Sequence, residues 1–182
     1  MRYAFFLSCL LFAGCAAIEP LSAPTGPGDS FGLSGRVAVK YGEEAVSGKI
    51  SWQHEPASDD LLLSTPLGQG VAHIVRRDAM VSLTTSDQKV YQASDVEGLT
   101  EQVLGWRLPL AGLHDWVRGR AAAGAPAQIR ADGSQHLSEL RQSGWLVEFQ
   151  DYDAASGLPV RLRLSREEVE IRLVIDNWRS EP

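Results

Sequence analysis

The stretch that decides the fold is VRLRLSREEVEIRLVI, from Val160 to Ile175. Apolar residues occupy alternate positions in its first and last parts, and polar residues, several of them arginine, lie between most of them. This period of two is typical of antiparallel strands with one face against a core and the other in water. The stretch therefore predicts two such strands, with the acidic pair Glu167-Glu168 at a turn or strand start between them.

The same period recurs earlier in the chain. It is present in residues 37–39, 50–52 and 145–149, and an apolar run at residues 61–63 leads through a turn to a further strand at Val71. A long antiparallel sheet must close on itself, pair with a second sheet or curl around another part of the chain. We therefore expect a mainly β domain of the α+β type.

Two short helices are predicted in the middle of the chain. Ser94-Asp95-Val96-Glu97 has the form of a capping box, in which Ser94 precedes a helix and caps it. Pro109 can open a second helix, and Gly119 is placed to end it. Each helix carries an apolar stripe, and short amphipathic helices suit the concave face of a curled sheet.

The N-terminus has the features of a bacterial lipoprotein signal. An apolar run of residues 3–13 follows a positively charged start, and it is too short to span a bilayer. Phe12-Ala13-Gly14-Cys15 resembles the lipobox at which such signals are cut, although Phe12 stands where leucine is usual. We expect residues 1–14 to be a signal peptide and Cys15 to be the acylated first residue. The alternatives are cleavage at Cys9 and an ordinary buried first helix.

The composition of the remaining chain limits its class. Residues 15–30 are rich in proline, glycine and small polar residues, which predicts a flexible tether, and residues 31–182 have the length of a single domain. The formal net charge is −6 and the only basic cluster is Arg76-Arg77, so nucleic acid is not an expected partner. With Cys9 removed and Cys15 acylated, no thiol remains for a disulfide, a metal site or a nucleophile.

The sequence contains no recognisable catalytic motif. It lacks a G-x-S-x-G elbow, an H-E-x-x-H helix and a phosphate-binding loop. The four histidines are far apart in sequence, and each is interpreted as a hydrogen-bonded or solvated residue rather than a base or a ligand. They are His54, His73, His114 and His136. The pair Asp59-Asp60 is interpreted as solvated charge. We expect no enzymatic activity, no metal site and no cofactor.

Two apolar features leave alternatives open. The five tryptophans fall on the expected dry faces of strands or in the helical region, where they either fill a core or line a cavity for an apolar ligand. The turn Pro66-Leu67-Gly68 joins two expected strands and leaves Leu67 at or near its tip. Leu67 is then either a scattered surface residue, a side chain folded back onto the sheet, or a side chain that enters a lipid interface.

These features together resemble the LolB family of outer-membrane lipoproteins. The resemblance rests on the lipobox cysteine, Gly35 in a strand, Trp52-Gln53, the Pro66-Leu67-Gly68 turn, the Pro109-Leu110 helix with Trp116 and Gly119, and the closing Asp176-Asn177-Trp178. It implies a curved, unclosed antiparallel β-barrel with short helices covering a hydrophobic cavity. It also implies an acceptor that takes lipoproteins from the periplasmic carrier LolA and inserts them into the outer membrane without an energy source.

The resemblance implies roles for individual residues as well. Leu67 is the protruding residue that enters outer-membrane lipid, and Ala16 after the acylated Cys15 agrees with sorting to the periplasmic face of the outer membrane. Aromatic residues are expected to line the cavity for the acyl chains of client lipoproteins. The candidates are Trp52, Trp116, Trp145, Phe149 and Trp178. We expect a monomer. Two rival functions remain, a structural lipoprotein that docks by a sheet edge and an envelope hydrolase.

Overall fold

The computed structural model describes residues 30–179, which form eleven strands and two helices. The predictions for the signal peptide, for Cys15 and for nearly all of the tether fall on residues 1–29 and lie outside the described residues. The elements are β1 (Phe31–Tyr41), β2 (Glu44–Glu55), β3 (Ser58–Ser64), β4 (Gly70–Arg77), β5 (Met80–Thr85), β6 (Val90–Ala93), α1 (Val96–Leu104), α2 (Leu110–Trp116), β7 (Ala127–Ala131), β8 (Leu137–Gln142), β9 (Trp145–Tyr152), β10 (Pro159–Arg166) and β11 (Val169–Arg179).

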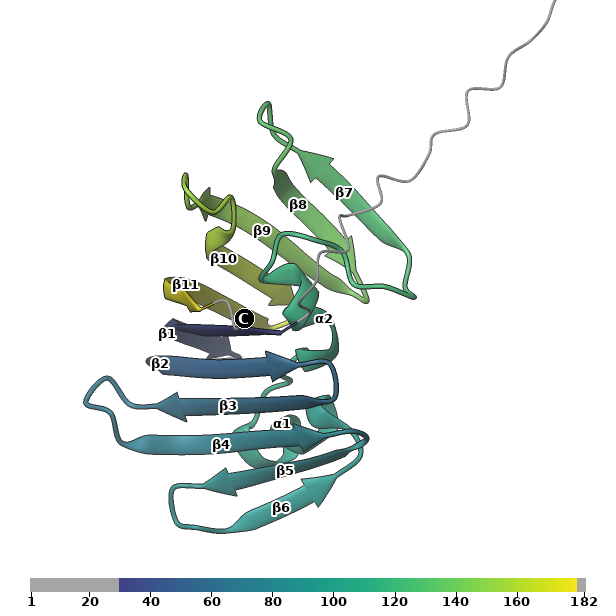
Figure 1. The fold of residues 1–182 in the computed structure, drawn as a ribbon. Coiled ribbons are helices and arrows are strands. Elements are labelled where there is room, and N and C mark those ends of the chain that lie inside the picture. Colours follow the sequence, from purple (N-terminus) through teal and green to yellow (C-terminus); the bar gives the residue numbers. More distant parts are fainter. Residues whose placement is uncertain (1–29, 180–182) are drawn as a thin grey trace, which may run out of the picture.

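All eleven strands belong to one antiparallel sheet, in the order β6-β5-β4-β3-β2-β1-β11-β10-β9-β8-β7. The sheet curls, and both helices lie on the same side of it, inside the curve (Figure 1). Within residues 30–179, β6 and β7 are not hydrogen-bonded to each other, so the barrel is unclosed. The predicted fold class is confirmed.

Strands β1 and β11 pair at the centre of the sheet. Val37 lies opposite Leu173, and the register shifts between Ser34 and Gly35. A Cβ atom on Gly35 would lie 2.1 Å from the carbonyl oxygen of Val174, so the close approach of the two strands at this shift requires glycine. The first and last strands of the domain are therefore neighbours at its centre.

The core consists of the inward-facing residues of the strands and the apolar faces of the helices. The alternation seen in the sequence is confirmed where it was strongest, because the predicted dry positions of β9 and β11 are buried, except that Val169 at the start of β11 is only partly buried. These positions are Trp145, Val147, Phe149, Ile171, Leu173 and Ile175. The outward-facing arginines of β10 and β11 lie on the wet side of the same strands, as expected.

Both helices occur where the sequence predicts them, but the cap of α1 differs. Asp95, rather than Ser94, is the N-cap, and its carboxylate accepts hydrogen bonds from the backbone N–H groups of Glu97 and Gly98. The side chain of Glu97 pairs with Arg166 at 3.6 Å instead of completing a capping box. A carboxylate caps a helix as well as a hydroxyl does, so the start shifts by one residue.

The hairpin turns that connect β1 to β6 lie alternately at the two opposite ends of these strands. The turns at residues 42–43, 65–69 and 86–89 share one end, which we name the Leu67 end. The turns at residues 56–57 and 78–79 share the opposite end with Phe31, the first residue of β1. We name this the His54 end, because His54 pairs with Phe31 there.

Candidate functional site

The turn between β3 and β4 presents Leu67 to solvent. The Gly68 N–H donates to the carbonyl oxygen of Thr65 at 2.8 Å, and the Thr65 N–H donates to that of Gln69 at 2.8 Å. Pro66 restricts one turn dihedral, and Gly68 has a φ of +92°, which residues with a side chain rarely adopt. Leu67 is 93% exposed. Its predicted exposure at the tip of a well-defined turn is confirmed, and its role stays a prediction.

The five candidate lining residues lie in or against the core. They are Trp52, Trp116, Trp145 and Phe149, all buried, and Trp178, which is partly buried. The indole Nε1 of Trp116 donates to Gln142 at 2.9 Å. The indole Nε1 of Trp145 is buried and has no hydrogen-bond acceptor among residues 30–179. Of the five rings, that of Trp116 comes from α2, and it lies against that of Trp145 with centroids 6.5 Å apart.

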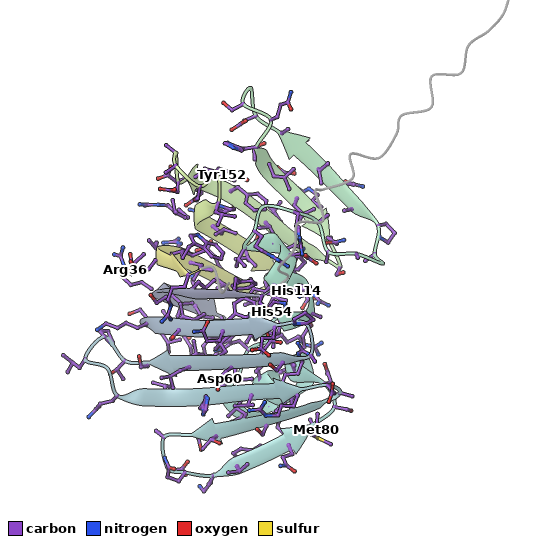
Figure 2. All side chains as sticks on the ribbon, in the orientation of Figure 1. Arg36, His54, Asp60, Met80, His114 and Tyr152 are labelled. Atoms are coloured by element: carbon purple, nitrogen blue, oxygen red, sulfur yellow. The ribbon has the colours of Figure 1, made fainter. Side chains whose placement is uncertain are left out.

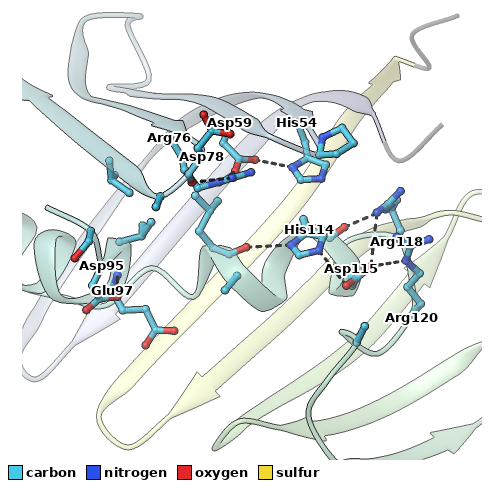
Figure 3. Close-up of a pocket in the computed structure, with 18 of the residues that line it drawn as sticks. His54, Asp59, Arg76, Asp78, Asp95, Glu97, His114, Asp115, Arg118 and Arg120 are labelled. Carbon is cyan, nitrogen blue, oxygen red and sulfur yellow. Dashed lines mark hydrogen bonds and ion pairs between the residues drawn. The ribbon is translucent and has the colours of Figure 1, made fainter. Parts of the chain in front are cut away.

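A cavity of about 750 Å³ opens at the His54 end, beside α2 and the turns at residues 56–57 and 78–79. None of the five candidate aromatic residues lines it. Its wall combines apolar side chains with charged and titratable ones of both signs (Figure 3). The titratable and charged residues are His54, Asp59, Arg76, Asp78, Asp95, Glu97, His114, Asp115, Arg118 and Arg120.

Asp59 organises the sheet side of this cavity. Its Oδ1 accepts a hydrogen bond from Nε1 of Trp52 at 2.8 Å and lies 2.7 Å from Nδ1 of His54, while Oδ2 accepts from Nε of Arg76. Burial alone would raise the pKa of the Asp59 carboxyl, but the hydrogen bonds from His54, Arg76 and Trp52 outweigh it and hold the pKa below its usual value. Asp59 is therefore a buried, ionised and fully paired carboxylate.

The interpretation of Asp59 as solvated charge is wrong, since only 2% of the residue is exposed. The alternation of β3 contained the signal, because Asp59 shares the inward face with Leu61 and Leu63. Its neighbour Asp60 points to the other face, where it meets His73 at 2.9 Å and stays exposed. The two residues of one acidic pair thus have opposite environments.

His54 and His114 join the sheet to helix α2. Their rings stack with centroids 4.9 Å apart and an interplanar angle of 14°, and Figure 2 shows the two labels together where α2 meets the sheet. His114 Nε2 lies 3.0 Å from the carboxylate of Asp115, which also pairs with Arg120. Burial raises the pKa of Asp115, but the hydrogen bonds from His114 and Arg120 prevail and lower it overall.

Both histidines are hydrogen-bonded, as predicted, but their meeting was not predicted. They are separated by four strands and a helix along the chain, and no short motif connects them. The result is a continuous series of contacts from the core to the helix that covers it. It runs through Trp52, Asp59, His54, His114 and Asp115.

The pair of His54 and Asp59 resembles two members of a hydrolytic triad, but the third is missing. In the part of the chain that the structure describes, no hydroxyl bonds to His54, whose ring lies between those of Phe31 and His114. The same residues contain no group of histidine, cysteine and acidic side chains that could hold a metal ion. None of the helices between residues 30 and 179 is long and apolar enough to cross a membrane.

Comparison with known proteins identifies relatives over the whole chain. The model of the family described as "Outer membrane lipoprotein LolB" matches residues 29–178. A protein of Thiobacillus denitrificans named outer-membrane lipoprotein LolB is 38% identical over 187 residues, with 100% of both chains covered. A protein of the same name from Nitrosomonas europaea is 43% identical over 157 residues, which cover 84% of this chain and 74% of that protein.

Solved structures confirm the architecture. A LolA superfamily protein from Nitrosomonas europaea superposes with a TM-score of 0.54 at 9% identity, with 86% of this chain and 88% of that chain covered. At such low identity the likeness concerns the fold alone. The sequence relatives carry the assignment further, because the family model spans nearly all described residues and one relative aligns from end to end. This chain therefore belongs to the LolB family of outer-membrane lipoproteins.

Proposed function

We propose that this protein accepts lipoproteins from the periplasmic carrier LolA and inserts them into the outer membrane, holding their acyl chains in a hydrophobic cavity inside the curled sheet. It acts as a lipid-anchored monomer on the periplasmic face of that membrane. Its partners are LolA, client lipoproteins and outer-membrane lipid, and it uses neither nucleic acid nor a cofactor or metal. Membership of a family of outer-membrane lipoproteins supports this location.

The observation that carries the proposal is the exposed Leu67 on a backbone-bonded turn. Burying a leucine side chain in lipid contributes roughly 1.5 to 3 kcal/mol, which is too little to anchor a protein and enough to orient one. Pro66 and Gly68 fix the turn that presents it. In the proposed mechanism Leu67 enters the lipid interface and brings the loaded domain into contact with the membrane.

The cavity forms, in this proposal, where the helices now pack. Leu99 of α1 and Leu110, Leu113 and Trp116 of α2 are buried against the core, and acyl chains can replace these contacts with similar apolar ones. The five candidate aromatic residues then become the cavity lining. Nε1 of Trp145 supports the idea, because a buried donor without an acceptor is rare and an acyl ester carbonyl would supply one.

The transfer runs downhill without an energy source. Each methylene group of an acyl chain that is exposed to water costs about 0.8 kcal/mol, so a client with two or three chains cannot cross the periplasm unprotected. Direct handover between two cavities avoids that exposure. The acceptor binds the chains more tightly than the carrier does, and the bilayer binds them more tightly still.

The anchor is proposed to be acylated Cys15, joined to the domain by residues 16–30. Because anchor and cavity are separate features, a soluble Cys15→Ala protein without residues 1–14 is expected to take up lipoprotein. We would mix it with LolA preloaded with a labelled lipoprotein and separate the two proteins by affinity tag. Label that moves without added nucleotide supports the proposal, whereas label that stays on a LolA competent with another acceptor overturns it.

A structural role in the envelope is the second candidate function. Strand β7 is an edge strand, and all five of its residues are exposed. An exposed edge can pair with a strand of another protein. This role predicts a purified protein without lipid and an envelope complex that Ile129→Pro disrupts. An envelope hydrolase is not supported, because the His54–Asp59 pair has no bonded nucleophile among the described residues.

A further inference from the structure

A small apolar groove of about 130 Å³ lies at the Leu67 end, on the concave side of the sheet. Strands β1 and β2 contribute Val37, Val39 and Val46 to it. The segment at and after the end of α1 contributes Leu104 and Trp106 from the other side. In Figure 1 this end is on the left of the view, where the turn between β3 and β4 projects.

The groove continues the core of the domain. Val46 lies on the same face of β2 as the buried residues Ile50 and Trp52, since all three occupy alternate positions. Val39 belongs to the core, and Val37 packs against it. The apolar surface therefore extends from the interior toward the Leu67 end without a polar interruption on this face of β2.

The groove also reaches the Leu67 turn. Ser64, the last residue before the turn, and Val71, the second residue of β4, both line it. Gly48 contributes no side chain to the floor, and a Cβ there would lie 2.1 Å from the carbonyl oxygen of Ser64. The strand spacing at this point thus permits no larger residue, and the groove remains unobstructed.

Several apolar side chains in this region are exposed. Val46 is 48% exposed and Val71 is 43% exposed, although both line an apolar groove. Together with Leu67 they form a series of exposed apolar side chains from the groove to the tip of the turn. Polar side chains would hydrate such a groove better, so the surface is suited to an apolar occupant.

We propose that this groove, named here the exit groove, binds one acyl chain of the client during delivery and leads it from the core to the Leu67 turn. The inference rests on the proposed function. If a chain left the core through open water, the equilibrium constant for leaving would fall about fourfold for every methylene group exposed. The exit groove keeps part of the chain covered until lipid surrounds Leu67.

The test uses the soluble Cys15→Ala domain without residues 1–14, loaded with a dipalmitoyl lipopeptide that carries a diazirine at the end of one acyl chain. The acceptor membranes are liposomes of phosphatidylethanolamine and phosphatidylglycerol. The variants Val46→Lys and Val71→Lys each place a further charge in the exit groove, which Lys49 also lines. Leu62→Lys is the matched control, because Leu62 is 40% exposed on β3 but lies between the buried residues Leu61 and Leu63, on the opposite face.

We expect both groove variants to deliver lipopeptide about tenfold more slowly than the parent, with uptake and liposome binding of the empty protein unchanged. Photolysis during delivery should label groove residues such as Val46, Val71 or Trp106. The Leu62→Lys control should deliver at the parent rate. Thermal unfolding of each variant verifies that it folds.

Three outcomes separate the possibilities. Parent-like delivery by both groove variants, or delivery without photolabel in the groove, overturns the exit groove and leaves the proposed function intact. Equal slowing by Leu62→Lys also overturns it, because the effect would then come from surface charge. A parent protein that takes up no lipopeptide overturns both proposals together.

Discussion

The two ends of the curled sheet contrast in chemistry. At the His54 end, Asp59 is buried under three hydrogen bonds, and stacked histidines connect the sheet to α2. At the Leu67 end, Leu67, Val46 and Val71 are exposed. Paired charges thus stabilise the His54 end, while the Leu67 end exposes apolar surface. If Leu67 contacts lipid as proposed, folding stability and lipid contact belong to opposite ends, and substitutions should separate them.

The largest effect is expected at the His54 end. Asp59→Asn removes the charge that pairs with Arg76 and His54, and it should lower the free energy of unfolding by about 3 to 5 kcal/mol, as for other broken buried ion pairs. Urea unfolding of the soluble domain measures this change. The matched control is Asp60→Asn on the same strand, whose exposed pair with His73 is worth at most about 1 kcal/mol. Equal losses in both variants would contradict the special role of Asp59.

The next effect is expected at the Leu67 end and concerns delivery. Leu67→Glu removes the proposed apolar contact with lipid, worth roughly 1.5 to 3 kcal/mol, so delivery into liposomes should slow about tenfold to a hundredfold. Receipt from LolA and the unfolding free energy should stay close to those of the parent. The control is Ile129→Glu, which places the same negative charge at an exposed apolar position on the edge strand β7. Loss of receipt and delivery together would show that the two steps are not divided between the ends.

The smallest effect concerns acid stability. The pKa of Asp59 is lower in the folded protein than in the unfolded chain, so its ionisation stabilises the fold above the unfolded pKa of about 4. That contribution is lost as pH falls below 4 and through the folded pKa. We expect the parent's unfolding free energy to fall over this range and that of Asp59→Asn to fall less. Parallel pH profiles for the two proteins would be the contrary result.

The sequence predicted the Leu67 end better than the His54 end, for a physical reason. Pro66, Leu67 and Gly68 are consecutive, and local rules for turns define both the geometry and the exposure of the leucine. The alternation of apolar residues likewise predicted the strands that carry the core. Local patterns of this kind are set by neighbours in the chain, so they can be read without knowing the fold.

The His54 end depends on contacts that only the fold creates. His54, Asp59 and Arg76 come from three successive strands, and their side chains meet because all three face inward at matching register positions. His114 joins them from a helix much later in the chain. The inward position of Asp59 was visible in the alternation, but its partners were not. Whether α1 and α2 pack onto the core or leave it open also depends on tertiary contacts, and the sequence suggested only that they cover it.

The missing pairing between β6 and β7 has a mechanical consequence. In a closed barrel, the number of strands and their stagger fix the radius. Here, in residues 30–179, the strand ladder ends at β6 on one side and β7 on the other, so the circumference can widen or narrow without the loss of a ladder hydrogen bond. The sheet is consequently stiff along its strands and compliant around its circumference. A sheet of this kind can change its width while each strand keeps its neighbours.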